Sequence, residues 1–210
     1  MKILESHFFE SDACSVAQSL LGKLIRHKYK NTWLTAQIIE TEAYYLTDKG
    51  SHASLGYTEK RKALFMPAGT LYMYYARGKD SLNVSCQGDG NAVLIKSAFP
   101  HAETGTQTDN TIQLMQALNP AASGELRPVH KLCSGQTLLC RSLNLKVTDW
   151  DQQGFDRQRF YFADQSYQTQ TIIQTTRLGI PQGRDEHLPY RFIDYDYARY
   201  CTSNPLTKRG

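Results

Sequence analysis

The chain contains 210 residues, of which 40% are hydrophobic and 21% are charged, values that are ordinary for a globular protein. No apolar run approaches the roughly 20 residues that a membrane-spanning helix needs, and the N-terminus lacks the apolar core of a secretory signal. The net charge of +4 permits an anionic partner without demanding one. Composition therefore excludes a membrane protein, a small secreted disulfide protein and a disordered tail, and it predicts one domain over residues 1–210.

The five cysteines are odd in number and scattered, without any Cys-x-x-Cys pair: Cys14, Cys86, Cys133, Cys140 and Cys201. This pattern argues against a disulfide framework and fits a reducing cytoplasm. Buried apolar thiols are favoured over a metal site.

The N-terminal part is expected to begin with a helix and to continue as strands. Ser11 is a candidate N-cap for a helix whose apolar stripe runs over residues 16–21 and ends at Gly22. An extended stretch, a long alternating strand and a polar loop are then expected at residues 24–25, 33–45 and 50–61.

A β-hairpin is the clearest expectation for the middle of the chain. Residues 70–75 and 81–86 are predicted strands, and Arg77-Gly78-Lys79-Asp80 is the connection between them. A third short strand at 92–98, two helices at 110–118 and 137–143, and a β-prone stretch at 161–174 follow. This mixture predicts an α+β fold with mainly antiparallel strand neighbours.

Two glutamates end the long strand and are candidates for chemistry. Because a strand alternates with period two, Glu40, Glu42 and Tyr44 are expected to share one face, which also carries Ile38. A buried carboxylate costs desolvation free energy unless it is paired or used. The alternative interpretation is a strand that leaves the core with its acids simply solvated.

The chain contains 13 tyrosines, and three of them lie in the first strand of the predicted hairpin, at 72, 74 and 75. Alternation puts Tyr72 and Tyr74 on one face and Tyr75 and Arg77 on the other. One face would line a pocket while the other meets a partner. The alternative is a tyrosine-rich strand that covers the edge of the core.

Several short motifs follow one another along the chain: Glu-Thr-Glu-Ala-Tyr at 40–44, Ser-His-Ala at 51–53, Gly-Thr-Leu-Tyr-Met-Tyr at 69–74, Leu-Asn-Val at 82–84, Ala-Val-Leu-Ile at 92–95 and Arg-Leu-Gly-Ile at 177–180. Each is weak alone, but their order and spacing resemble the alkyladenine (3-methyladenine) DNA glycosylases over nearly the whole chain. The resemblance implies a single glycosylase domain with a formyltransferase C-terminal-like fold. Such a fold has a curved, mainly antiparallel sheet, flanking helices and a protruding β-hairpin.

The resemblance also implies a catalytic set. Glu42 would be the general base that activates the attacking water, and Lys96 and the backbone carbonyl of Leu178 would help to hold that water. Lys96 departs from the family, whose members typically have an arginine there. No cofactor is implied, and no metal is expected, because the sequence has no clustered Cys/His spacing.

The remaining matched positions would bind DNA. Tyr44 and Tyr74 would sandwich a flipped base, His52 would close the pocket edge, and Asn83 would exclude a purine 2-amino group. Arg77 would be the intercalating wedge, at a position where relatives typically have an aromatic residue or a histidine. Alternation would point Arg77 towards the duplex if Tyr74 faces the pocket.

The leading hypothesis is a monofunctional DNA-3-methyladenine glycosylase that starts base excision repair. Its partner would be double-stranded DNA carrying alkylated purines, with deaminated and etheno purines as further candidate substrates. A lesion-binding protein with weak hydrolysis is the alternative, and a small-molecule glycosidase that uses Glu40 and Glu42 is a third interpretation. A monomer without membrane association is expected, located in the cytoplasm, at the nucleoid in a prokaryote or in the nucleus in a eukaryote.

Overall fold

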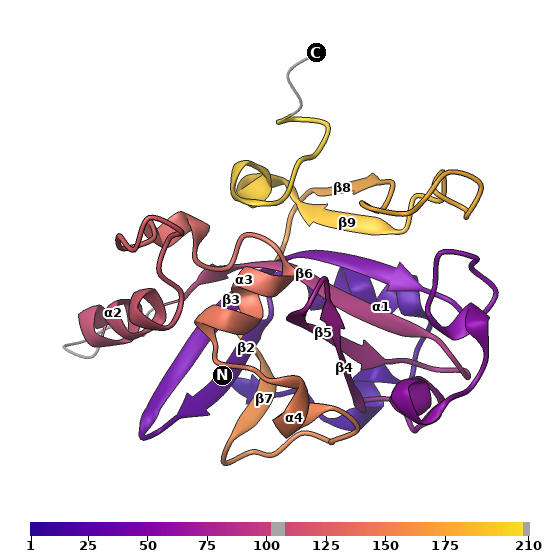
Figure 1. The fold of residues 1–210 in the computed structure, drawn as a ribbon, viewed down its shortest axis with the longest axis horizontal. Coiled ribbons are helices and arrows are strands. Elements are labelled where there is room, and N and C mark those ends of the chain that lie inside the picture. Colours follow the sequence, from indigo (N-terminus) through magenta and orange to yellow (C-terminus); the bar gives the residue numbers. More distant parts are fainter. Residues whose placement is uncertain (102–107, 208–210) are drawn as a thin grey trace.

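The computed structural model describes residues 1–101 and 108–207 (Figure 1). One sheet forms the centre of the described chain, in the order β1-β7-β2-β3-β6-β5-β4, and β9 joins β3 and β8. The strands are β1 (Lys2–Ile3), β2 (Leu24–Tyr29), β3 (Thr32–Tyr44), β4 (Leu71–Ala76), β5 (Lys79–Ser85), β6 (Ala92–Pro100), β7 (Phe160–Asp164), β8 (Ile172–Thr175) and β9 (Arg191–Asp194). All of these pairings are antiparallel, so the predicted α+β fold with a mainly antiparallel sheet is confirmed.

The helices lie against this sheet: α1 (Ala13–Leu20), α2 (Thr108–Leu118), α3 (Gln136–Ser142) and α4 (Val147–Trp150). The predicted helices at 110–118 and 137–143 are confirmed within two residues. The predicted loop at 50–61 is only partly a loop, because it contains the short 3₁₀ helix Ala53–Leu55 and the start of another, Glu59–Phe65. None of the described helices combines the length and apolar character needed to cross a membrane.

Helix α1 begins one residue later than predicted. Asp12, and not Ser11, is the N-cap, and its Oδ2 accepts a hydrogen bond from the Ser15 amide at 3.1 Å. The other carboxylate oxygen accepts from the Tyr45 hydroxyl at 2.7 Å, which ties the helix start to the end of β3. The helix ends before Gly22, whose φ of +80° favours glycine.

Side-chain alternation changes phase within β3. Ile38 and Ala43 both belong to the central core, although a regular strand would put residues at this odd spacing on opposite faces. The register with β6 shifts on both sides of Glu40, where β9 also joins the edge of β3. The prediction that Ile38 shares a face with Glu40, Glu42 and Tyr44 is therefore wrong, since the irregularity puts these three residues on the face opposite to Ile38 and Ala43.

The predicted hairpin is confirmed, and its turn is tighter than the four-residue connection expected. Ala76 pairs with Lys79, so Arg77 and Gly78 alone form the turn. Both have positive φ, +51° and +76°. Two consecutive positive φ values are the signature of a type I′ turn, which matches the twist of the flanking strands.

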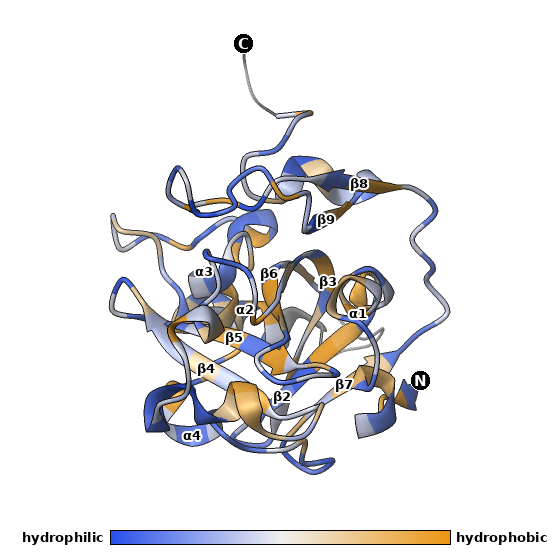
Figure 2. Ribbon diagram, turned by 90° about the vertical axis from the view of Figure 1, so that its right-hand side faces the viewer, coloured by the Kyte–Doolittle hydropathy of each residue, from blue (hydrophilic) through white to orange (hydrophobic). Residues whose placement is uncertain are grey.

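Four apolar clusters form the interior of the described chain, and two of them bear on the site. The larger one joins α1 side chains to those of β3, β6 and α3, and Figure 2 shows this apolar centre in orange beneath more hydrophilic loops. Four of the five cysteines are buried and all five are free thiols, as predicted.

The smaller apolar cluster contains Ala53, Ala63, Leu64, Tyr72 and Ala92, and it lies under the loops that follow β3. The smaller cluster supports the pocket described next.

Candidate active site

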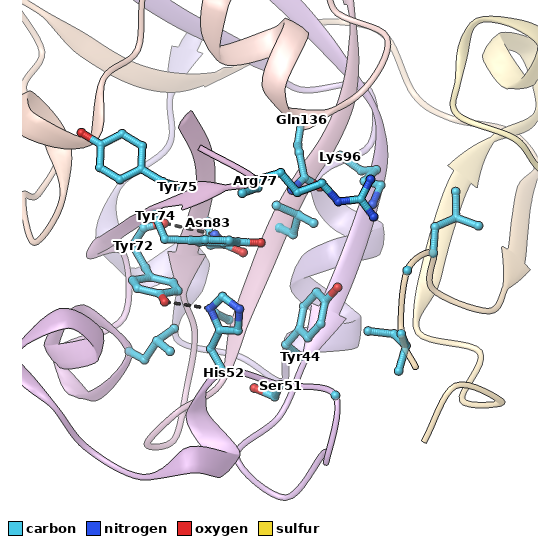
Figure 3. A pocket seen from close by; sticks show the side chains of 18 of the residues that line it. Tyr44, Ser51, His52, Tyr72, Tyr74, Tyr75, Arg77, Asn83, Lys96 and Gln136 are labelled. Atoms are coloured by element: carbon cyan, nitrogen blue, oxygen red, sulfur yellow. Dashed lines mark hydrogen bonds between the residues drawn. The ribbon is translucent and has the colours of Figure 1, made fainter. Parts of the chain in front are cut away.

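A cavity of about 840 Å³ opens where β3, β4, β5 and β6 meet the segment after β8. Its volume suits a small-molecule or nucleotide-sized ligand. Four chain regions build it: the strand ends, the loop that carries His52, the start of α3, and residues 178–184. Figure 3 shows aromatic side chains from the first two regions gathered around the hollow.

Glu42 is fully buried, and its hydrogen-bonding partners line the cavity. Lys96 Nζ lies 3.2 Å from Oε1, and the Leu178 amide donates to the same oxygen at 3.2 Å. The Tyr44 hydroxyl donates to Oε2 at 2.8 Å. The structure thus brings together Glu42, Lys96, Leu178 and Tyr44. The resemblance assigns a role to the backbone carbonyl of Leu178, whereas the contact with Glu42 is made by the backbone amide.

Glu40 is also fully buried, but it belongs to a different network. Arg191 donates through Nε at 2.7 Å, and Ser97 and Thr202 donate hydroxyl hydrogen bonds at 2.5 and 2.6 Å. None of these residues lines the cavity. The interpretation of a glycosidase with Glu40 and Glu42 as paired carboxylates is not supported, because the two groups do not share a site.

Aromatic rings form the wall opposite Tyr44 (Figure 3). The His52 ring packs edge-on against Tyr74, with centroids 4.5 Å apart, and His52 Nδ1 lies 2.9 Å from the Tyr72 hydroxyl. Tyr72 and Tyr74 stack at 5.6 Å, which confirms that they share a face. Burial lowers the pKa of His52, and the positive charges of Arg61 and Arg184 lower this pKa further. The pKa shift favours a neutral His52 at neutral pH.

Asn83 lies on β5, buried at the back of the cavity. Its Nδ2 donates to the Tyr72 carbonyl at 3.2 Å, and this bond fixes the orientation of the amide.

Burial raises the pKa of Tyr44 well above its ordinary value, and the neighbouring Glu42 carboxylate raises this pKa further. Tyr44 therefore stays a neutral hydrogen-bond donor.

Arg77 lies at the exposed tip of the hairpin and forms part of the cavity rim together with Tyr74. Figure 3 shows Arg77 extending over the hollow, away from Tyr75. The prediction that Tyr74 and Arg77 point to opposite faces is therefore wrong, because strand alternation ends at Ala76 and the turn re-aims the next residue. Tyr75 is 56% exposed and points away from the other labelled rings in Figure 3.

Sequence patterns predict no role for two groups of residues near the cavity. Gln136, Arg184 and Ile180 line it, and Arg177 and Asp48 form a buried ion pair beside it. Arg177 begins the Arg-Leu-Gly-Ile motif, so the sequence marks its position. The spacing of neighbouring residues does not show which distant residue Arg177 contacts. In the described ranges, no cluster of three or more His, Cys, Asp and Glu residues could hold a metal ion.

Comparison with known proteins identifies the family of this chain. Residues 7–198 match the family described as methylpurine-DNA glycosylase (MPG). Two similar bacterial proteins, each named "Putative 3-methyladenine DNA glycosylase", come from Pseudomonas syringae pv. tomato and Pseudomonas aeruginosa (strain LESB58). They are 62% identical over 207 residues and 58% identical over 208 residues, covering 99% of this chain and 92% and 86% of theirs.

A mammalian relative is more distant. The "DNA-3-methyladenine glycosylase" of Mus musculus is 31% identical over 198 residues, covering 90% of this chain and 58% of its own length. The match thus extends from bacteria to mammals and covers nearly all of this chain. The chain belongs to the methylpurine-DNA glycosylase family, and it is a DNA glycosylase, a hydrolase of DNA repair.

Proposed function

We propose that the cavity receives an alkylated purine turned out of duplex DNA and that Glu42 activates the water that releases it. A base inside a duplex cannot be reached for hydrolysis, so it must be extruded into a pocket. The observation that carries this proposal is the buried carboxylate of Glu42, whose partners Lys96, Tyr44 and Leu178 all line an aromatic cavity.

The base would lie between Tyr44 on one side and Tyr74 with His52 on the other. An alkylated purine such as 3-methyladenine is cationic in DNA, and each electron-rich tyrosine face attracts a cation by about 0.5–2 kcal/mol. The lowered pKa of His52 supports this arrangement, because a neutral imidazole does not repel a cationic base.

Glu42 would take a proton from a water as the water oxygen attacks C1′ of the deoxyribose. The N-glycosidic bond breaks, and its electron pair leaves with the base, which becomes neutral if it was cationic. Lys96 and the Leu178 carbonyl would hold the water. A cationic base is already a good leaving group, so one carboxylate can suffice, whereas hypoxanthine or ethenoadenine would need further help at the leaving base.

Asn83 would act as the substrate filter. Its amide is fixed by the bond to the Tyr72 carbonyl, so it cannot move aside at low cost. A guanine-type 2-amino group would meet it and leave a donor unpaired, whereas adenine has no such group.

Arg77 would fill the gap that the extruded nucleotide leaves. Its exposed place at the hairpin tip is suited to entering DNA, and a guanidinium can stack on bases and hydrogen-bond the orphaned partner base. We further propose that residues 1–210 form one glycosylase domain that acts as a monomer on the DNA of a bacterial cytoplasm.

One assay of the wild-type protein tests this function. We expect release of free 3-methyladenine from alkylated duplex DNA, stronger binding to that duplex than to undamaged duplex, and no hydrolysis of an aryl glycoside. Binding without base release would instead identify a lesion-binding protein. Hydrolysis of the aryl glycoside alone would contradict the DNA substrate.

A further inference from the structure

Arg177 is a fully buried arginine that lies beside the cavity and does not line it. Its Nη1 donates to Asp48 Oδ2 at 2.7 Å and to the Ala43 carbonyl at 3.1 Å. The Asp48 side chain is only 5% exposed, so both members of the ion pair are removed from water. Screening by solvent is therefore weak, and the charges of this pair act at longer range than those of a surface pair.

The guanidinium lies over the ring of Tyr44, with Cζ 4.6 Å from the ring centroid, and it also contacts the Tyr190 ring at 5.4 Å. Asp48, Ala43 and Tyr190 do not line the cavity, whereas Tyr44 does. Arg177 therefore covers the face of Tyr44 that is turned away from the cavity. The other face is the one available to a base.

The hydrogen bonding of Arg177 is incomplete for a buried ion pair. Within residues 1–101 and 108–207, Nε and Nη2 have no hydrogen-bond partner. Buried donors are normally satisfied, and a buried ion pair gains stability only when its remaining donors are satisfied too. Because two of its nitrogens have no acceptor while its guanidinium lies over two tyrosine rings, the placement of Arg177 is explained better by its contact with Tyr44 than by stability alone.

A charge on the Arg177 side of the Tyr44 ring acts on any base that stacks on the cavity side of the same ring. The guanidinium and a stacked base would be about 8 Å apart, since a ring and two contact distances separate them. At this distance a unit charge still changes the binding of a cation measurably, while the binding of a neutral base changes little. In the native pair, Asp48 offsets much of the charge of Arg177.

We propose that the Arg177–Asp48 pair sets how strongly the pocket prefers a positively charged base over a neutral base of the same shape. The pair acts through Tyr44 and does not touch the substrate, so Arg177 and Asp48 are positioning and specificity residues. The inference rests on the proposed function, because it requires a base against the front of Tyr44.

The test is a series of variants that grades the charge behind Tyr44. Asp48→Asn leaves a net positive charge there, the wild type is balanced, and Arg177→Gln leaves a net negative charge. Arg177→Lys keeps the balance and serves as the charge-conserving variant. Two duplex probes have the same lesion shape: cationic 3-methyladenine on a 2′-fluoro sugar, which slows hydrolysis, and neutral 3-methyl-3-deazaadenine.

The measured quantity is the ratio of the dissociation constants for the neutral and the cationic probe, taken within each variant. A loss of folded protein changes both constants equally and leaves the ratio unchanged. We expect preference for the cationic probe to rise from Asp48→Asn through wild type to Arg177→Gln, by about threefold to thirtyfold per unit charge. Arg177→Lys should match the wild-type ratio. Asn has nearly the same shape as Asp. If Arg177→Gln does not fold, Asp48→Asn therefore still shows whether an added positive charge lowers the preference for the cationic probe.

A matched pair controls for net charge. Lys23 and Asp164 form an ion pair at 2.6 Å and do not line the cavity, so Lys23→Gln and Asp164→Asn should leave the ratio unchanged. A ratio that does not follow the charge behind Tyr44 overturns this inference. A wild-type protein that binds neither lesion better than undamaged duplex would instead overturn the proposed function.

Discussion

Glu40 and Glu42 lie two residues apart on β3, and both are fully buried, yet their surroundings differ. Glu40 is paired with Arg191 and accepts hydrogen bonds from Ser97 and Thr202, all away from the cavity. Glu42 is held by groups that themselves face the cavity. Burial alone therefore does not identify a functional carboxylate, whereas the position of its partners does.

The largest effect on stability is expected at Glu40. Glu40→Gln leaves the buried Arg191 guanidinium without its countercharge, and breaking such a pair typically costs about 3–5 kcal/mol of unfolding free energy. Urea denaturation would measure this loss. Glu5→Gln removes one partner of the exposed Glu5–Arg157 pair and should cost less than about 1 kcal/mol. Similar losses for both variants would refute the structural role of Glu40.

Substitution of Arg77 should reduce excision from duplex DNA and leave excision from single-stranded DNA nearly unchanged. Unstacking a base costs a few kcal/mol, so loss of a wedge slows capture of the lesion more than hydrolysis of an accessible base. We expect Arg77→Ala to reduce excision from duplex about tenfold or more, with little change on single-stranded DNA. Arg77→Tyr should restore excision, and Arg77→Lys should not. Equal losses on both substrates would eliminate the wedge, and Tyr75 would be the next candidate.

A change of specificity is expected at Asn83, of roughly 10–200-fold at most, as for one added or missing group in a pocket. Asn83→Ser removes bulk at the back of the cavity, so release of 7-methylguanine should increase relative to 3-methyladenine. Competition between the two lesions in one reaction gives the ratio directly. An unchanged ratio would show that another residue excludes the 2-amino group.

The smallest effect concerns pH. Because the pKa of His52 is lowered in the folded protein, the unfolded chain binds more protons below the ordinary histidine pKa of about 6.5. Unfolding free energy should therefore fall as pH decreases from about 6.5 towards the folded pKa, and His52→Gln should flatten that slope. His187→Gln, at an exposed position, is the matched control. A slope unaffected by His52→Gln would contradict the assignment.

Local sequence patterns predicted the elements that depend on local interactions. The long strand, the hairpin and α3 follow from alternation, turn chemistry and helical periodicity, and all three are present. The α1 cap was misplaced by one residue because Ser11 and Asp12 are both good caps, and the distant Tyr45 hydroxyl favours the second.

Contacts between distant segments were not predictable in the same way. The phase change at Glu40 occurs where β9 joins, and the partner Arg191 is 151 positions away in the chain. Arg177 likewise reaches Asp48 across 129 positions. Alternation in the hairpin indicated that Tyr72 and Tyr74 share a face, whereas the pocket roles of Tyr44 and His52 came only from the family resemblance. The separation of Glu40 from Glu42 depends on tertiary structure.

The most direct test of the distinction between the two glutamates measures two quantities on the same two variants. For Glu42→Gln, we expect the single-turnover rate of 3-methyladenine release to fall about 10²–10⁴-fold, as on loss of a general base, while lesion binding persists. For Glu40→Gln, the rate per folded molecule should stay near that of the wild type although unfolding free energy falls. Activity retained by Glu42→Gln and lost in folded Glu40→Gln would contradict the account.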